Sequence, residues 1–391
     1  MQVLLTLTLN WSKNINRLFS RKPSKLYPLQ KSFKHQAKSS WSKCLILSIA
    51  ITFFACNHSK QQFETTFGPG LLIVNQGNYT YSNASISFYD FNSKQTIHKA
   101  FFLINHFHIG DVAQSATIID TNIFIVVNNS GKILVLNKNT FKYTATITGL
   151  TSPRYMQVVN DSLAYVTDLY GDLSIINYRF FRKTGQIRLG RSSEAIARWH
   201  EYVFVTNWSY GNKIFRINTS TQVIDSLTVR YQPNSLAIDK NGKVWVLSDG
   251  GLIFNTDKDT VPALTVIDAQ RFEIERIYDF DSTNISPTSL VINQSKDTLF
   301  FLVSAWQPTQ NANFGVYRMA VSDSSLPVSP FISQGQHTFY ALNYLSNGWL
   351  AVCDAKDFVQ PGQVLIFDSR NGELLFSTPA GIIPGYVVMK N

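Results

Sequence analysis

The sequence is poor in cysteine, which limits the covalent chemistry available to the folded protein. Its 391 residues contain only Cys44, Cys56 and Cys353. We expect Cys44 to be lost with a leader peptide and Cys56 to carry a lipid, so the folded body keeps one thiol and cannot form an internal disulfide. Cys353 ends an apolar run with no histidine close to it in sequence, which predicts a buried structural thiol and not a nucleophile.

The sequence also lacks the short motifs that mark the common catalytic folds. It contains no nucleophile elbow, no phosphate-binding loop and no dinucleotide-binding glycine pattern. The Gly-His and Trp-Asp pairs typical of WD40 repeats are absent as well. These absences give no support to an enzyme and predict no cofactor.

Acidic residues are missing from the N-terminal part of the chain. Residues 1–56 hold nine of the 35 lysines and arginines and no acidic residue, so the net charge of +10 falls to +1 over the remainder. A nearly neutral body offers no basic surface for phosphate groups, which argues against nucleic acid as a partner.

The basic segment leads into a short hydrophobic run that predicts a signal peptide. Residues 44–55 are apolar over about a dozen positions, fewer than the roughly 20 needed to cross a bilayer. The run ends in Phe53-Phe-Ala-Cys56, which resembles a bacterial lipobox, and a cleaved signal with an incidental cysteine is the alternative. We therefore expect a signal region at 1–55, a lipidated Cys56 with a tether at 56–69, and a folded domain at 70–391. This predicts membrane attachment through the lipid, as an outer-membrane lipoprotein at the cell surface or on the periplasmic face of the cell envelope.

A repeat of forty residues organises the folded domain. Gly131, Gly171 and Gly211 recur at that spacing, each within four strand-sized segments that show no helical period. This pattern is typical of β-propeller blades and predicts an all-β, seven-bladed β-propeller. The expected openings of the seven inner strands are Val112 to Thr117, Pro153 to Met156, Ser193 to Ile196, Pro233 to Leu236, Pro287 to Leu290, Phe339 to Leu342 and Pro384 to Val387.

The two ends of the domain predict how the ring closes. Residues 383–390 read as an inner strand with nothing after it, whereas residues 70–104 supply three strands with no inner strand before them. We expect the N- and C-terminal strands to share one blade, which would leave no open sheet edge. The acid or amide residues at the outer hairpins are predicted to form tight turns at Asp90, Asn137, Asn177, Asn218, Asp268 and Asp368.

A binding site is expected on the face where the loops between second and third strands meet the openings of the inner strands. Aromatic rings beside hydrogen-bonding amides and charges suit a large, mostly neutral organic ligand. Many of these residues could instead pack between blades or shape turns, and Tyr155 and Tyr386 are expected to be core residues. The candidate ligand-binding residues are Asn75, Tyr79, Tyr81, Asn128, Arg154, Asp168, Tyr170, Glu194, Trp208, Tyr210, Asn234, Asp249, Trp306, Tyr340 and Asp354.

Two groups of residues contain side chains of the types that bind metals, but no metal is predicted. His106 and His108 with Asp111 would present two imidazoles on one face if the segment were a strand. Glu194, together with the acids at 168, 249 and 354, would offer oxygen ligands for Ca²⁺ if all four ringed the channel. Both arrangements depend on side chains that would have to converge in space.

The opening segment resembles a known group of propellers. Val74-Asn-Gln-Gly-Asn-Tyr79 followed by Asn83-Ala-Ser-Ile-Ser-Phe-Tyr-Asp90, with the lipobox and seven degenerate blades, is similar to YncE-like propellers of the DUF5074 type. Within that group the sequence looks like BtuG-type surface lipoproteins. The resemblance implies capture of cobalamin for a TonB-dependent outer-membrane transporter. It carries over no individual contact residue, because no short motif defines one.

Together these observations predict a non-enzymatic, lipid-anchored binding protein for a large organic ligand. The resemblance makes a corrinoid such as cobalamin the expected ligand. One alternative is a propeller enzyme of the lactonase or lyase kind, which would need a metal or an acid–base pair at the channel. Another is a scaffold for other proteins of the cell envelope.

Overall fold

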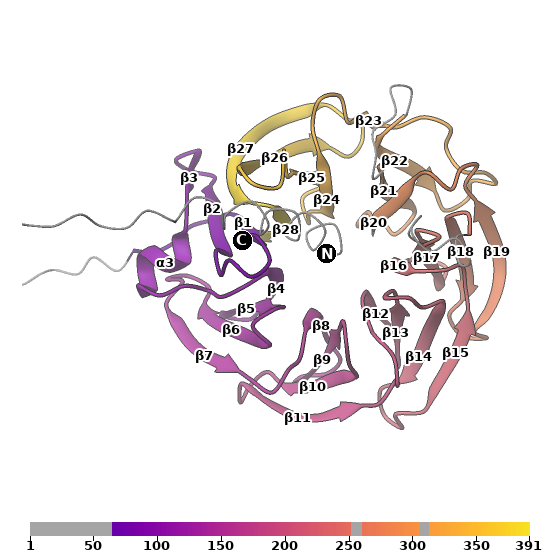
Figure 1. Cartoon of the computed structure of the whole chain (residues 1–391), viewed down its shortest axis with the longest axis horizontal. Coiled ribbons are helices and arrows are strands. Elements are labelled where there is room, and N and C mark those ends of the chain that lie inside the picture. The colour runs from indigo at the N-terminus through magenta and orange to yellow at the C-terminus, as the bar shows by residue number, and fades with distance from the viewer. Residues whose placement is uncertain (1–64, 252–259, 305–312) are drawn as a thin grey trace, which may run out of the picture. The chain divides into compact units, whose positions relative to one another are not determined.

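The computed structural model describes residues 65–251, 260–304 and 313–391. All of these residues except Thr65 belong to one compact unit, Thr66–Asn391. This unit contains seven antiparallel sheets of four strands each. In Figure 1 the sheets stand as blades around one axis, with one strand of each blade nearest to it. The predicted seven-bladed β-propeller is confirmed. In the described part of the chain, no helix is long and apolar enough to cross a membrane.

We number the blades from the first complete repeat, and each strand list runs from the axis outward. Blade 1 contains β4 (Ala113–Ile119), β5 (Asn122–Val127), β6 (Lys132–Asn137) and β7 (Tyr143–Ile147), and blade 2 contains β8 (Pro153–Val158), β9 (Leu163–Asp168), β10 (Leu173–Asn177) and β11 (Arg182–Ile187). Blade 3 contains β12 (Ile196–Trp199), β13 (Tyr202–Asn207), β14 (Lys213–Asn218) and β15 (Ile224–Thr228), and blade 4 contains β16 (Pro233–Ile238), β17 (Lys243–Ser248), β18 (Ala263–Asp268) and β19 (Glu273–Asp279). Blade 5 contains β20 (Ser286–Ile292), β21 (Thr298–Ser304), β22 (Gly315–Ala320) and β23 (Ile332–Ser333), and blade 6 contains β24 (Phe339–Tyr344), β25 (Trp349–Asp354), β26 (Pro361–Asp368) and β27 (Leu374–Ile382). Blade 7 contains β28 (Pro384–Lys390), β1 (Gly70–Asn75), β2 (Ser85–Asp90) and β3 (Gln95–Ile97).

Blade 7 closes the ring with strands from both ends of the chain, as predicted. β28 pairs antiparallel with β1, from Gly70 opposite Lys390 to Val74 opposite Tyr386. The buried ammonium of Lys390 donates hydrogen bonds to the carbonyl oxygens of Phe67 and Gly68, at 2.6 and 2.8 Å. Burial lowers the pKa of Lys390. The closure therefore joins the last strand both to its sheet and to the segment that enters the propeller.

The tight turns between third and fourth strands form where the sequence predicts them. The side-chain oxygen of Asn137 accepts the backbone N–H groups of residues 139 and 140, at 2.9 and 3.1 Å. The side chains of Asn177 and Asn218 make the same pair of contacts two and three residues further along the chain. Asn and Asp favour such turns because their side-chain oxygen accepts hydrogen bonds from backbone N–H groups that have no partner strand in the turn. Each of these residues therefore fixes one outer hairpin.

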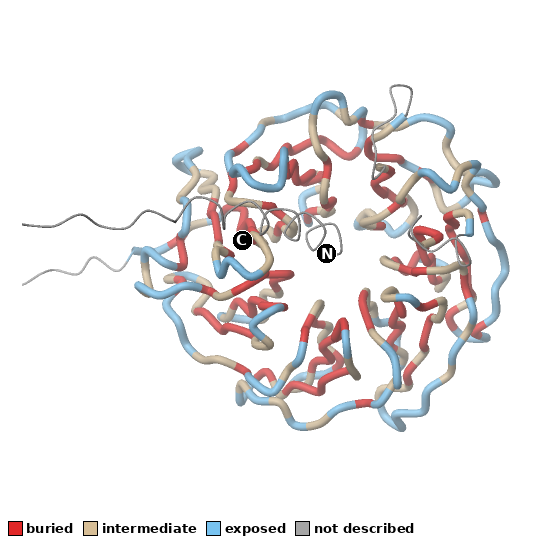
Figure 2. The backbone as a smooth tube through the Cα atoms, viewed as in Figure 1, coloured by how far each residue is buried: buried red, intermediate tan, exposed pale blue. Residues whose placement is uncertain are grey.

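The core lies between the blades and not within one central cluster. Figure 2 shows buried residues mainly along the second and third strands of the blades, a mixture of buried and intermediate residues along the inner strands, and exposed residues along the outer ones. Apolar side chains of each blade pack on the next, as Phe204 of blade 3 does on Phe272 of blade 4. Cys353 is fully buried between blades 6 and 7, and burial raises the pKa of its thiol. The prediction of a structural thiol is confirmed.

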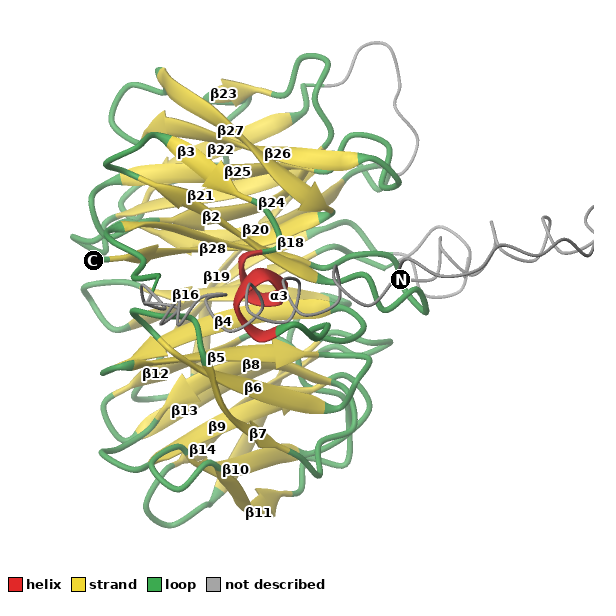
Figure 3. Ribbon diagram, turned by 90° about the vertical axis from the view of Figure 1, so that its left-hand side faces the viewer, coloured by secondary structure: helices red, strands yellow, loops and turns green. Residues whose placement is uncertain are grey.

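A short helix, α3 (Ala100–Asn105), lies between β3 and β4, where the sequence shows no helical pattern. Figure 3 shows it at the rim of the propeller, beside blade 7. Its buried Phe101 joins the core cluster that contains Phe141 of blade 1. The Asn105 amide donates to the carbonyl oxygens of both phenylalanines, at 2.9 Å each. Tertiary packing thus stabilises a helix too short to persist alone.

Candidate functional site

The openings of the inner strands and the loops between second and third strands share one face of the propeller, which we call the mouth face. The second residue of several inner strands is polar and lies at this end of the channel: Gln114 in β4, Arg154 in β8, Asn234 in β16 and Tyr340 in β24. Inner strands of neighbouring blades contact one another around the axis. Side chains that project from them toward the axis are therefore close enough to interact.

The centre of the mouth face contains a buried ion pair. The guanidinium of Arg154 donates through Nε and Nη2 to the two carboxylate oxygens of Glu194, at 2.7 and 2.6 Å. Its Nη1 donates to Oε1 of Gln114 at 2.5 Å. The side chains of Arg154 and Glu194 are 13% and 6% exposed. Burial opposes the charge on the guanidinium, but the carboxylate outweighs it and raises the pKa of Arg154.

Three tyrosines from different blades surround this pair. The ring centroids of Tyr155 in blade 2 and Tyr386 in blade 7 are 6.3 Å apart, although blade 1 lies between those blades, so the rings meet across the channel. Tyr155 accepts a hydrogen bond from Nε2 of Gln114 at 3.2 Å, and the phenol of Tyr340 donates to Oε1 of Gln76 at 2.9 Å. Burial raises the pKa of all three phenols. Tyr386 packs against the core cluster of blades 7 and 1, as expected, and both tyrosines lie on inner strands beside the Arg154 layer.

More tyrosines lie above this layer, in the loops of the mouth face. The pKa of Tyr170 is raised by burial and, to a smaller extent, by the phenols of Tyr79 and Tyr210, while the guanidinium of Arg154 opposes the rise. Tyr170 therefore lies within electrostatic range of the other three residues, although the four come from three blades. Tyr170 is 64% exposed and Tyr210 is 50% exposed, so their rings are accessible from solvent. Tyr81 is equally exposed, at 66%, on the loop between β1 and β2.

A second polar cluster joins blades 3 and 4 on the same face. The indole N–H of Trp208 donates to Oδ2 of Asp249 at 3.1 Å, and the backbone N–H of Gly251 donates to Oδ1 at 3.0 Å. Burial raises the pKa of Asp249 to about 6, against smaller opposing effects from these donors and from Asn234. Asp249 is thus a buried carboxyl group with a pKa about one unit below neutral pH.

Four of the candidate residues instead hold the loops in place. Asn128 donates to the hydroxyl of Ser152 in the next blade, and Asn75 accepts the backbone N–H of Gly381 at 2.8 Å. The carboxylate of Asp168 accepts hydrogen bonds from the backbone N–H groups of residues 151, 152 and 170. The carboxylate of Asp354 accepts hydrogen bonds from the backbone N–H groups of residues 338 and 356. It is also bonded to the side chains of His337 and Gln363. Burial would raise the pKa of Asp354, but these donors outweigh it and lower the pKa.

The two metal arrangements considered from sequence do not form. His106 is the C-cap of helix α3, and the His108 ring lies 4.8 Å from that of Phe102 between centroids, in a tilted arrangement, so the pair does not lie on a strand face. Asp111 instead accepts the N–H of Thr80 and the amide of Asn129. The four acids expected around the channel are bonded separately, as described above. Within the described ranges, no three His, Cys, Asp or Glu side chains are arranged to hold a metal.

Trp306 and Cys56 lie outside the described residues, so their predicted roles stay predictions. Gln114 and Gln76 belong to the channel layer but were not among the candidates. Register would have revealed Gln114, because it holds the same position in β4 as Arg154 does in β8.

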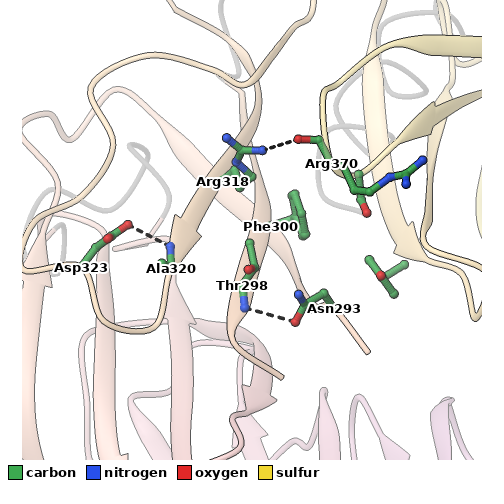
Figure 4. A pocket seen from close by; sticks show the side chains of 9 residues that line it. Asn293, Thr298, Phe300, Arg318, Ala320, Asp323 and Arg370 are labelled. Carbon is green, nitrogen blue, oxygen red and sulfur yellow. Dashed lines mark hydrogen bonds between the residues drawn. The ribbon is translucent and has the colours of Figure 1, made fainter. Parts of the chain in front are cut away.

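A separate cavity of about 500 Å³ lies on the opposite face, between blades 5 and 6. Figure 4 shows the side chains of Arg318 and Phe300 at its wall, with Asn293 below them. Arg318 packs over Phe331 at 4.0 Å from the ring centroid and donates to the backbone carbonyl of Arg370 at 2.8 Å. These contacts tie two blades together, at the end of the strands away from the mouth face.

The central layer can donate hydrogen bonds to a bound molecule. Three of the five N–H groups of the Arg154 guanidinium bond to Glu194 and Gln114, which leaves two that bond to no group in the described ranges. Because Glu194 neutralises the positive charge, these donors suit a neutral acceptor such as an amide or ester carbonyl better than a free anion. The tyrosine rings above offer flat surfaces for a broad ligand.

The fold and this site define a β-propeller with a polar, aromatic-lined channel mouth. The chain belongs to the family described as a domain of unknown function, DUF5074, whose model matches residues 69–348. No curated protein matches the sequence. The resemblance to DUF5074 propellers is thereby confirmed.

Solved structures of several different proteins share the fold. The chain is similar to a quinonprotein alcohol dehydrogenase-like protein from Bacteroides thetaiotaomicron, with 14% identity over 83% of this chain and 79% of that one and a TM-score of 0.61. It is also similar to the periplasmic gluconolactonase of Pseudomonas aeruginosa, with 10% identity over 83% and 99% of the two chains and a TM-score of 0.60. Hydrazine synthase from Kuenenia stuttgartiensis matches at 14% identity over 71% and 89%, with a TM-score of 0.55. At these identities the likeness concerns the fold alone.

Proposed function

We propose that this protein is a binding protein for a large, mostly neutral organic ligand that docks on the mouth face. The observation that carries the proposal is the Arg154–Glu194–Gln114 network beneath accessible tyrosines. In this arrangement the guanidinium donates to a carbonyl of the ligand, and Tyr170 and Tyr210 contact its flat surface. Pre-organised donors inside a buried layer favour such recognition because binding need not order them.

A corrinoid such as cobalamin is the specific ligand that we propose. Its broad ring carries neutral amide side chains, which match the paired, uncharged character of the central layer. The choice of ligand rests on the resemblance of the opening segment to BtuG-type lipoproteins. We further propose that the protein is anchored in the outer membrane through Cys56 and passes its ligand to a TonB-dependent transporter.

Calorimetric titration of cobalamin tests the proposal. Wild type should bind, and Tyr170→Ala, Trp208→Ala and Tyr210→Ala should each weaken binding by roughly 1–3 kcal/mol, as loss of an aromatic anchor does. Tyr143→Ala is the matched control, because this tyrosine is also exposed but lies on the outer strand β7. Absence of heat with wild type contradicts the corrinoid. Equal affinities for wild type and all mouth-face variants contradict the site.

A lactonase is the second candidate function, favoured by one observation. Asp249 is a buried carboxylate on the mouth face with a pKa of about 6, a value suited to a general base near neutral pH. If wild type hydrolyses gluconolactone, and the activity is lost in Asp249→Asn but retained in Tyr143→Ala, the protein is a lactonase. Cobalamin binding without lactone hydrolysis would favour the binding protein. A partner protein retained with neither activity would point to the scaffold.

A further inference from the structure

A cavity of about 490 Å³ lies between blades 6 and 7, away from the central layer of the channel. Blade 6 contributes the start of β26 and the end of β27, and blade 7 contributes the start of β2. The segment around helix α3 completes the wall. The volume falls within the range of about 300–1,000 Å³ that is typical of small-molecule sites.

The inner wall of this cavity is apolar. Ile86, Phe101, Ile109 and Ala380 line it and are each at most 2% exposed, so they form a floor out of contact with bulk water. Phe102, which is 38% exposed, lies nearer the surface, and its ring contacts that of His108. Such a floor favours a hydrocarbon group, because burial of each methylene contributes about 0.8 kcal/mol.

The ionisable side chains that line the cavity are all basic. Lys99 and Lys356 line the cavity and are exposed, as are the imidazoles of His98 and His108. No aspartate or glutamate is among the lining residues. Neither lysine has a salt-bridge partner in the described part of the chain, so both ammonium groups can meet an anion. The rim therefore offers two ammonium groups to an anion.

We propose that this cavity binds an amphipathic monocarboxylate, such as a fatty acid, with its hydrocarbon chain on the apolar floor and its carboxylate at the lysine rim. Apolar surface and unpaired positive charge occur together here. The carboxylate accepts hydrogen bonds from Lys99 and Lys356, while the chain packs on Phe101 and Phe102. This site shares no residue with the Arg154 layer, so the inference does not depend on the proposed function.

Calorimetric titration with octanoate, decanoate and dodecanoate below their micelle concentrations tests the chain contacts. Each added methylene should tighten the dissociation constant by about threefold to fourfold until the cavity is full. Decan-1-ol serves as the uncharged control and should bind more weakly than decanoate. Absence of decanoate binding, or equal affinity for decanoate and decan-1-ol, would overturn the proposal.

Variants then locate the site. Phe102→Glu places a carboxylate beside the bound anion and should weaken decanoate binding at least tenfold, whereas Leu103→Glu, at an exposed neighbouring position that does not line the cavity, should leave it unchanged. Lys356→Met should weaken binding about twofold to fivefold, the scale of a partly exposed ion pair. Unchanged affinity in both Phe102→Glu and Lys356→Met would exclude this cavity, even if decanoate binds elsewhere. Cobalamin titrations of the same variants separate this outcome from failure of the mouth-face site.

Discussion

At the scale of residues, the Arg154–Glu194 pair shows how a buried charge is kept in the channel. Each charge is tolerated because the other is bonded to it through two hydrogen bonds. Arg154→Met leaves Glu194 buried without its partner and should lower the free energy of unfolding by about 3–5 kcal/mol, measured by urea denaturation. Ligand binding at the mouth face should be lost in the same variant.

Two comparisons decide whether the loss comes from the unpaired charge. The double variant Arg154→Met/Glu194→Gln should recover much of the stability, because no buried charge remains, but should not recover ligand binding. Arg230→Met breaks the exposed pair with Asp279 and should cost at most about 1 kcal/mol. If Arg154→Met also lowered the free energy of unfolding by at most about 1 kcal/mol, the central pair would not be behaving as a buried ion pair.

The carboxyl group of Asp249 should make stability depend on pH. Its folded pKa of about 6 lies above the ordinary value of 3.8 because the group is buried. The folded state therefore holds the proton more tightly, and the resulting stability is present at low pH and lost as pH rises from about 4 to about 6. Relative to Asp249→Asn, wild type should lose roughly 2–3 kcal/mol across that window in urea unfolding. A pH-independent difference would contradict the raised pKa.

At the scale of elements, β28 is the strand on which ring closure depends. It pairs along the whole of β1 and contributes Tyr386 to the channel and Lys390 to the closure. Deleting residues 383–391 exposes the edge of β1 and the apolar face between blades 6 and 7. We expect the truncated protein to lose its cooperative thermal transition in calorimetry. Deletion of Asn391 alone, which is exposed, should leave the transition unchanged.

At the scale of the whole molecule, we predict that attachment to the membrane depends on one thiol. Cys56→Ala should move the protein from the membrane to the soluble fraction, because lipidation of this residue is the proposed anchor. Cys44→Ala, in the segment expected to be cleaved, should remain in the membrane fraction. The measurement is immunoblotting of salt-washed membranes. A Cys56→Ala protein that stays membrane-bound would contradict the lipoprotein proposal.

Most of the architecture could be predicted from the sequence because six of the seven blades are built from neighbouring segments. Strands follow one another as hairpins, so alternation and turn residues such as Asn137 and Asn218 carry local information about the fold. The closing blade joins strands from the two ends of the chain, and it was predicted because residues 383–390 lacked a following strand while residues 70–104 lacked an inner one. Helix α3 could not be predicted in this way, because its stability comes from packing on blades 1 and 7.

The grouping of the site residues was decided only by the tertiary structure. Asp168 and Glu194 both lie near the mouth face, yet one carboxylate binds loop N–H groups and the other pairs with Arg154. The sequence by itself determined that polar and aromatic residues gather on this face, through the register of the blades. It could not determine which of them meet, because partners such as Tyr155 and Tyr386 are far apart in the chain and come together only when the ring closes.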